Sequence, residues 1–396
     1  MVPGLFFTYS LVALAMTVNA LRRPVLPPSR FPPLWLPGLV TTEMAGFWFV
    51  SRIAVAVVAG VAGAWTSTVG RTGFILLGAA QAGLVGVMAR NRASRGRLHR
   101  SAGTESPPAR GWARLFSRHI RRPEHVDLVC EVEYHQGLTL DLYRHTAHRG
   151  EPSPTLVYVH GGSWTGGGPH KQARPLFHHL AERGWIVATI RYPLSPAATH
   201  PEHLIGVKRA LAWCKTTGAA AGVDPDRVAI AGGSAGAHLA SLAALTADRS
   251  DLQPGFEHLD TSVAACVPMY GVYDFLNRNG TRWDWPVIPQ AVMKATAEHA
   301  PEAYRDASPI DQIHPGAPPF LVVHGTHDSL VPPLEARHFV DALGAVSRSA
   351  VRLLEVDGAQ HAFDAFASPR TRVVVAHITR FLEDAVDPLV PRTEHR

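Results

Sequence analysis

A single serine stands among glycines in the segment VAIAGGSAGAHLA, residues 228–240. A serine hydroxyl attacks a carbonyl carbon only when a base removes its proton and the oxygen is held in the open. Side chains at Gly232 and Gly236 would collide with neighbouring backbone in the sharp turn that displays such a serine. This glycine spacing recurs by chance in glycine-rich chains, but here it follows an apolar run and precedes an Ala/Leu helix pattern. The pattern predicts that Ser234 is a nucleophile.

The partners of such a serine come later in the chain. Asp328 follows one apolar run, in VVHGTHDSLVP, and His361 follows the next, in EVDGAQHAFD. In the order serine, aspartate, histidine, the histidine takes the serine proton and the aspartate orients the imidazole. Asp274, after VPMYGVY, is an alternative acid. We therefore predict a triad of Ser234, Asp328 and His361.

The glycine-rich segment HGGSW, residues 160–164, offers donors for the negative oxygen that an attack on an acyl carbon creates. We expect this oxyanion hole to use backbone N–H groups of Gly161, Gly162 and Ser163. The N–H of Ala235, at the start of the helix after the serine, is a further donor. The segment GGSWTGGGPHK lacks the Gly-Lys-Ser/Thr ending of a phosphate-binding loop.

These polar residues follow short apolar runs, the pattern of buried strands. Strand patterns occupy residues 155–160, 185–192, 227–232, 263–271, 320–325 and 351–356, and helical patterns occupy 202–216, 236–246, 334–343 and 371–385. Two further runs, 127–135 and 138–144, flank a turn and predict a hairpin. The alternation predicts an α/β fold whose mainly parallel sheet carries helices on both faces. In such a sheet, functional residues gather at the carboxyl ends of the strands.

The motifs together resemble those of α/β-hydrolases. HGGSW, RYPLSP, DPDRVAIAGGSAGAHLA, HGTHDSLVP and GAQHAF are similar to segments of the carboxylesterase and lipase family related to hormone-sensitive lipase, over about residues 126–385. The resemblance implies the α/β-hydrolase fold and hydrolysis of carboxylic esters through an acyl-enzyme, without metal or organic cofactor. The family's usual HGGG is here HGGS followed by Trp164. That variant also resembles feruloyl-esterase-like and arylformamidase-like members.

Two alternatives to an esterase therefore stay open. One is an amidase of the arylformamidase kind. The other is a membrane scaffold whose hydrolase fold has lost activity, although a complete set of triad residue types argues against it.

Residues 274–312 separate two predicted strands and are long for a connection. We interpret them as a cap over the site, with Trp283, Trp285 and Met293 lining an acyl pocket together with Trp164. The alternative is that these apolar side chains only pack the cap onto the domain. A capped site with a tryptophan in its oxyanion loop predicts short to medium acyl groups.

The first 90 residues are predicted to form a membrane anchor. Apolar stretches at residues 5–21, 45–69 and 72–89 contain a single charge, Arg52, and each has about the length that crosses a bilayer. No positive segment precedes the first stretch, so we expect an uncleaved span. The anchor thus has about three transmembrane helices in contact with membrane lipids.

Residues 91–125 are rich in Arg, Ser, Pro and Gly and predict a basic juxtamembrane linker, in which residues 112–120 form a short helix on the headgroups. The catalytic domain then spans 126–396. Arginines follow the first and third apolar stretches, at 22–30 and 90–100. Because positive charge favours the inner face, we expect a multi-pass protein of the cell membrane with a cytoplasmic catalytic domain. Arg52 is expected to reach the same surface.

The composition argues against other partners. The net charge is +6, but the basic cluster lies between residues 90 and 122, beside apolar segments, so we expect no nucleic-acid partner. The three cysteines are widely spaced, and the chain has no Cys-x-x-Cys or His-Glu-x-x-His motif. We therefore expect no metal site. The expected partners are an ester or lipid substrate and membrane lipids.

Overall fold

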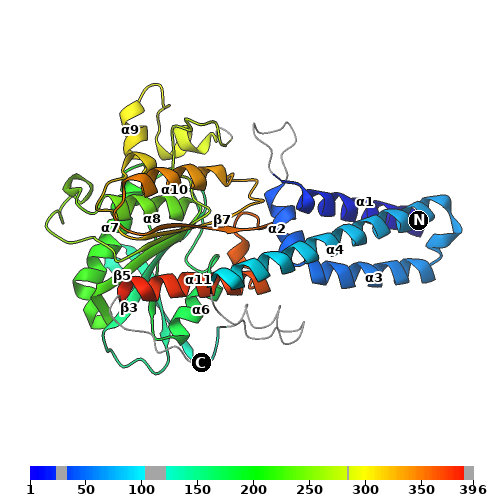
Figure 1. The fold of residues 1–396 in the computed structure, drawn as a ribbon, viewed down its shortest axis with the longest axis horizontal. Coiled ribbons are helices and arrows are strands. Elements are labelled where there is room, and N and C mark those ends of the chain that lie inside the picture. The colour runs from blue at the N-terminus through cyan, green and yellow to red at the C-terminus, as the bar shows by residue number, and fades with distance from the viewer. Residues whose placement is uncertain (24–33, 103–121, 283–284, 388–396) are drawn as a thin grey trace.

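The structure is a computed structural model that describes residues 1–23, 34–102, 122–282 and 285–387. A sheet domain and a helical bundle lie end to end, and the longest helix of the bundle reaches the sheet domain (Figure 1). Helices cover the predicted apolar stretches 5–21 and 72–89, and the predicted strands after residue 126 are also present.

The sheet domain is built on eight strands in the order β1-β2-β4-β3-β5-β6-β7-β8. In chain order they are β1 Val126–His135, β2 Leu138–His145, β3 Ser153–Val159, β4 Ile186–Ile190, β5 Val223–Gly233, β6 Cys266–Met269, β7 Phe320–Gly325 and β8 Val351–Val356. β1 and β2 form the predicted antiparallel hairpin, and all neighbouring strands from β4 to β8 are parallel. The prediction of a mainly parallel sheet is confirmed.

Helices cover both faces of this sheet, because successive strand residues point to opposite sides. Val157 and Val159 of β3 share one apolar layer with α7 (Glu202–Lys215), α8 (Ala235–Leu245) and α10 (Leu334–Val346). Leu156 and Tyr158 share the other layer with α6 (Arg174–Glu182) and α11 (Pro369–Val386). Of these helices, only α6 was missing from the sequence-based prediction.

The helical bundle contains α1 (Val2–Leu21), α3 (Ala45–Val61) and α4 (Thr68–Ala102). By length and composition, α1 and α4 could each cross a membrane. A third crossing results if α3 is joined to the short helix α2 (Trp35–Glu43), from which it is bent by 85°. The described chain therefore has two to three helices that could span a bilayer.

The middle apolar stretch was predicted to form one span over residues 45–69, but its helix is shorter. α3 ends at Val61, Gly63 adopts a left-handed φ of 82°, and a 3-10 turn at Ala64–Thr66 leads into α4. Arg52 does not reach the surface. Its side chain is 1% exposed, and Nη1 donates to Thr17 Oγ1 at 2.8 Å. Thr17 on the neighbouring helix α1 thus accepts a hydrogen bond from the guanidinium, which lipid chains could not do.

The predicted linker 91–125 is wrong over residues 91–102, because α4 continues through them. Val87, Ser94 and Leu98 are buried on one face of this helix, and Leu98 belongs to the apolar layer of α6 and α11. His377 of α11 donates from Nε2 to the Leu98 carbonyl at 2.7 Å. The arginine-rich segment thus stays helical because one face packs against the sheet domain. The short helix expected at 112–120 lies outside the described residues.

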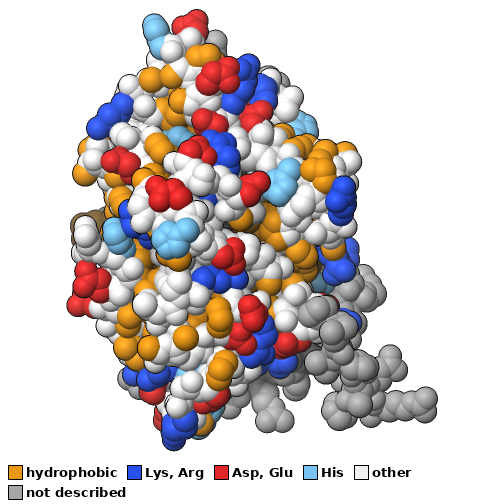
Figure 2. All heavy atoms as spheres, turned by 90° about the vertical axis from the view of Figure 1, so that its left-hand side faces the viewer, with side chains coloured by type: hydrophobic (Ala, Val, Ile, Leu, Met, Phe, Trp, Pro, Cys, Tyr) orange, Lys and Arg blue, Asp and Glu red, His pale blue; other side chains and the backbone are white. Residues whose placement is uncertain are grey.

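The end of the sheet domain that faces away from the bundle carries acidic, basic and histidine side chains interspersed with small hydrophobic areas (Figure 2). This mixture is typical of a surface in contact with water.

Candidate active site

Ser234 occupies a sharp turn between β5 and α8. Its φ of 57° and ψ of −120° are unusual for a residue with a side chain. A Cβ at Gly232 would lie 2.3 Å from the Gly236 carbonyl oxygen, and one at Gly236 would lie 2.0 Å from the Val159 oxygen. The turn therefore requires glycine at both positions. Ser234 is half-buried, whereas its immediate neighbours are buried.

The structure brings the three predicted triad residues together. The Ser234 hydroxyl lies 2.9 Å from Nε2 of His361, and Nδ1 of His361 lies 2.7 Å from Oδ2 of Asp328. With the Nδ1 proton donated to Asp328, Nε2 is free to accept the serine proton. This is the arrangement in which a histidine acts as general base toward a serine.

Asp328 is fully buried and is held as a carboxylate. Its Oδ1 accepts hydrogen bonds from the backbone N–H groups of Leu330, at 2.9 Å, and Val331, at 2.8 Å. Burial alone would raise its pKa. The imidazoles of His361 and His324 outweigh that effect and lower the pKa of Asp328 to about 2. The group that orients His361 is therefore ionised at neutral pH.

The alternative acid, Asp274, has different partners. Its carboxylate accepts hydrogen bonds from the N–H groups of Leu276 and Arg278 and pairs with the Arg278 guanidinium at 3.1 Å. These bonds stabilise the start of the predicted cap. Asp328, not Asp274, contacts the histidine.

The oxyanion-hole candidates separate into two groups. Gly161 is buried, and its N–H already donates to Oε1 of Gln172 at 2.8 Å, so this predicted donor is occupied. Gly162 and Ser163 are exposed, with φ values of 132° and 55°. A Cβ at Gly161 would lie 3.0 Å from the Ser234 Cβ, which places the loop directly beside the nucleophile.

The remaining donor, Ala235, begins α8 immediately after the serine. Its N–H has no partner in the preceding turn of its own helix, so it is available to a negative oxygen. The geometry thus favours Gly162, Ser163 and Ala235 as donors.

Trp164, a predicted pocket residue, is 2% exposed. Its indole N–H donates to Nδ1 of His238 at 3.2 Å, and Nε2 of His238 donates to the Ala307 carbonyl at 2.7 Å. The His238 ring stacks on Phe275, with centroids 4.3 Å apart. Burial lowers the pKa of His238 to about 3, so the ring is neutral. This histidine joins the oxyanion loop, the helix after Ser234 and the cap region.

The other predicted pocket residues lie in the cap region, residues 274–312. Trp285 and Met293 are partly buried and pack against the core shared with α7, α8 and α10. The Arg282 guanidinium lies 5.3 Å from the centre of the Trp285 ring. Trp283 lies outside the described residues. These contacts give Trp285 and Met293 a packing role, and a role in acyl binding stays a prediction.

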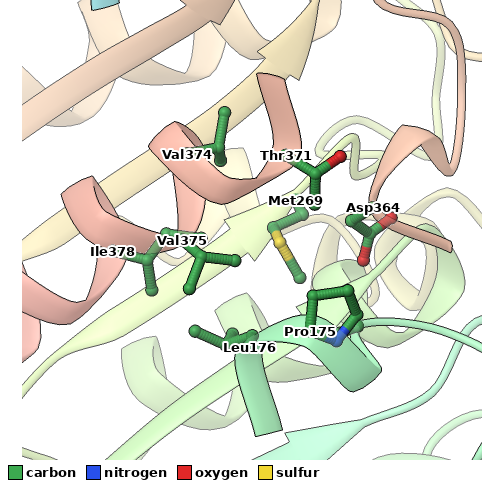
Figure 3. Close-up of a pocket in the computed structure, with 9 residues that line it drawn as sticks. Pro175, Leu176, Met269, Asp364, Thr371, Val374, Val375 and Ile378 are labelled. Atoms are coloured by element: carbon green, nitrogen blue, oxygen red, sulfur yellow. The ribbon is translucent and has the colours of Figure 1, made fainter. Parts of the chain in front are cut away.

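A buried tyrosine–aspartate pair lies behind the histidine. The Tyr270 ring contacts the His361 ring with centroids 4.7 Å apart, and its hydroxyl donates to Asp364 at 2.5 Å. Burial raises the pKa of Asp364 to about 6. Asp364 also borders a cavity of about 10 Å³ between α6, β6 and α11 (Figure 3). Such a volume holds about one water molecule, so it is no substrate site.

Sequence reasoning missed three contacts of the site: Gln172 on Gly161, Tyr270 on His361, and Trp35 on His361. Tyr270 lies near the carboxyl end of the predicted strand 263–271 and directly follows the observed strand β6, so the rule that functional residues gather at strand ends could have found it. Nothing in the local sequence marks Gln172 or Trp35. Within the described ranges, no group of three or more His, Cys, Asp or Glu side chains could hold a metal ion.

The sequence matches the BD-FAE family over residues 140–343, about half of the chain. This chain belongs to the BD-FAE family of α/β-hydrolases. It is 43% identical over 298 residues to the probable carboxylic ester hydrolase LipM of Mycobacterium tuberculosis, covering 74% of this chain and 69% of LipM. It is 41% identical over 287 residues to the esterase LipQ of the same organism, covering 71% and 68%. The predicted family is thus confirmed.

Solved structures of esterases share the fold. The esterase Est2 of Thermogutta terrifontis has a TM-score of 0.56 at 22% identity, covering 68% of this chain and 96% of that chain. A truncated carbohydrate esterase from gut microbiota has a TM-score of 0.57 at 19% identity, covering 66% and 96%. These similarities confirm the α/β-hydrolase fold.

Proposed function

We propose that this member of the family is a membrane-anchored serine esterase that hydrolyses short to medium acyl esters. The main support for this proposal is the pair of hydrogen bonds that links Ser234 to His361 and His361 to Asp328. The names of LipM and LipQ support ester hydrolysis as the reaction.

In the proposed reaction, Ser234 Oγ attacks the ester carbonyl carbon while His361 Nε2 takes the hydroxyl proton. The carbonyl oxygen becomes negative and is stabilised by the N–H groups of Gly162, Ser163 and Ala235. His361 then gives its proton to the alcohol oxygen as the ester bond breaks, leaving Ser234 acylated. Water, deprotonated by the same histidine, attacks the acyl-enzyme and releases the acid. Throughout, Asp328 stabilises the imidazolium.

The N-terminal helices support membrane anchoring, with the sheet domain on the cytoplasmic side. α1 ends next to Arg22 and Arg23, and Arg90 of α4 donates to the Ala20 carbonyl at 2.9 Å. The arginine-bearing ends of both helices therefore lie together, beside the sheet domain (Figure 1). Positive charge at one end of a bundle favours the cytoplasmic face. In a reporter fusion after Arg396, fluorescence of green fluorescent protein is expected, and alkaline phosphatase activity would contradict this orientation.

The reaction is tested with the full-length protein in detergent. Wild type should hydrolyse p-nitrophenyl esters best at short to medium acyl length and react with a fluorophosphonate probe. Ser234→Ala should lose labelling and about 10⁶-fold in kcat. The exposed Ser250 provides the control, since Ser250→Ala should retain both. Turnover of N-formylkynurenine above that of the esters would favour an amidase instead, and efficient triolein hydrolysis with little activity on butyrate would contradict the acyl-length proposal.

A further inference from the structure

The first turn of α2, a helix of the N-terminal bundle, contacts the histidine of the proposed triad. The Trp35 ring lies edge-on to the His361 ring, with centroids 6.0 Å apart and planes at 80°. The Tyr270 ring contacts the same imidazole at 4.7 Å. The sheet domain and the bundle therefore each supply one aromatic ring to the general base, and Trp35 is only half-buried there.

α2 also packs closely against Gln360, the residue before His361. A Cβ at Gly38 would lie 3.0 Å from Nε2 of Gln360, so the helix backbone and this side chain are in close contact. Gln360 is buried, and its Oε1 accepts a hydrogen bond from the Ser329 N–H at 3.2 Å. Through Gln360, α2 is connected both to the loop that carries His361 and to the loop that carries Asp328.

The end of α2 is fixed to the sheet domain by a buried ion pair between Glu43 and Arg370. Arg370 also donates to the Asp357 carbonyl at 3.0 Å, within the loop that leads to His361. In α4, Arg90 Nη1 lies 2.9 Å from Nε2 of His327, the residue before Asp328. Charged groups of the bundle thus hold both loops of the proposed triad.

α2 lies across the end of the bundle, because it is bent by 85° from α3. Its start is fixed to α1 by Asn19, which hydrogen-bonds to both the N–H and the carbonyl of Leu34, at 2.7 and 2.8 Å. Leu34 is 64% exposed and Leu36 is 52% exposed, one on each side of Trp35 in the chain. Exposed leucines at the end of membrane-crossing helices suit the boundary between headgroups and acyl chains.

We propose that α2 is a functional part of the active site. Trp35 is a positioning residue for the imidazole of His361, and Leu34 and Leu36 place this site at the membrane surface, where the substrate is an amphiphilic ester held in the bilayer. The proposal rests on the proposed esterase function. Leu34 and Leu36 are the chain neighbours of Trp35, which contacts His361, so an ester held beside these leucines lies close to the histidine.

The positioning role is tested with water-soluble p-nitrophenyl butyrate and the full-length protein in phosphatidylcholine/phosphatidylglycerol vesicles. Trp35→Ala should lower kcat by about 10- to 100-fold, because small displacements of a catalytic group are costly, and should leave KM nearly unchanged. Trp35→Phe keeps a ring against the imidazole and should restore most of kcat. Trp65→Ala is the matched control, because Trp65 stacks on Phe74 in the bundle and should leave kcat unchanged.

The membrane role is tested with dodecyl butyrate dissolved in the same vesicles. It has the same acyl group as the soluble ester, but its alcohol partitions into the bilayer. The double variant Leu34→Ser/Leu36→Ser removes two apolar side chains from the membrane. It should lower the rate with dodecyl butyrate at least about tenfold more than the rate with p-nitrophenyl butyrate.

Failure of this proposal is distinguishable from failure of the esterase assignment. If wild type hydrolyses p-nitrophenyl butyrate and Ser234→Ala does not, the esterase assignment holds whatever the α2 variants do. Given that result, an unchanged kcat in Trp35→Ala, or a loss in Trp35→Ala that Trp35→Phe does not restore, overturns the positioning role. Equal losses on both butyrates in the leucine variant would mean that the substrate comes from water.

Discussion

The helical bundle and the sheet domain leave different side chains exposed. Among the described residues, every exposed large hydrophobic side chain lies between Met1 and Val85, except Val346 in the sheet domain. The sheet domain instead buries its large hydrophobic residues in two layers, one on each face of the sheet. The exposed apolar side chains of the bundle suit the membrane anchor that we propose, whereas the sheet domain hides its apolar side chains from water.

The two regions also satisfy polar groups differently. In the bundle, Arg52 donates to Thr17 and Gln81 donates to the Phe49 carbonyl, so these polar side chains find partners on other helices. In the sheet domain, Ser234 and His361 come together where strands end, which is how such sheets build sites. All three side chains of the proposed triad thus lie in the sheet domain, and the bundle contacts one of them, His361, through Trp35.

The largest expected effect tests whether the sheet domain alone supplies the chemical groups. Asp328→Asn should reduce kcat on p-nitrophenyl butyrate by about 10⁴-fold, because the amide cannot stabilise the imidazolium or keep its tautomer. Asp274→Asn serves as the control and should have a small effect on kcat, since Asp274 pairs with Arg278. A large loss in Asp274→Asn together with a mild loss in Asp328→Asn would reverse the acid assignment.

The second prediction concerns the junction of the two regions. Glu43→Gln leaves the Arg370 guanidinium, 2% exposed, without its buried carboxylate partner. Breaking a buried ion pair in this way should lower the free energy of unfolding by about 3–5 kcal/mol. The exposed ion pair of Arg97 with Asp357 provides the comparison. Arg97→Gln should lower the free energy of unfolding by less than about 1 kcal/mol. Denaturant unfolding in detergent measures both. Equal, small effects would mean that the two regions fold independently.

The smallest expected effect is a pH dependence that arises in the sheet domain, because residues 1–90 contain no histidine. Burial lowers the pKa of His238 to about 3, so the native state keeps the ring neutral while the unfolded state binds a proton below its ordinary pKa of about 6.5. The stability that this residue contributes is complete above pH about 6.5 and is lost as the pH falls toward 3.

The expected slope is about 1.4 kcal/mol per pH unit for this histidine. It is measured as the free energy of unfolding between pH 4 and 7. His238→Gln should show a flatter profile than wild type, and identical profiles would contradict the prediction. Burial also lowers the pKa values of His200 and His203 to about 4, so some slope should remain in the variant.

Much of the fold was predictable because it depends on local patterns. Strand positions followed from short apolar runs, and the helices after residue 200 followed from their periodicity. α6 was missed, since its nine residues include a proline and two histidines and carry a weak helical signal. Arginine-rich composition does not by itself indicate an irregular chain, since arginine is a good helix former. The linker prediction is wrong over residues 91–102 for this reason and because Leu98 packs on the sheet domain.

Some features of the candidate site were likewise predictable from local sequence, and others were not. The turn at Ser234 was predictable, because the glycine spacing is a steric requirement that holds wherever the turn occurs. The occupied N–H of Gly161 was not, because its acceptor Gln172 reaches it only in the folded loop. The burial of Trp164 was likewise decided by packing against His238 and Phe275.

The sequence by itself determined the nucleophile turn, the order of the three polar residues and the presence of apolar helices at the start of the chain. The turn depends on local backbone sterics, the order of the polar residues depends on the order of the strands along the chain, and the helices depend on the length of the apolar stretches. Each of these properties is contained in the sequence itself. Only the tertiary structure decided that the bundle meets the sheet domain at the proposed triad, with Trp35 on His361 and Glu43 on Arg370. Such contacts join residues separated by most of the chain, so they depend on the three-dimensional packing of the two regions and leave no local pattern in the sequence.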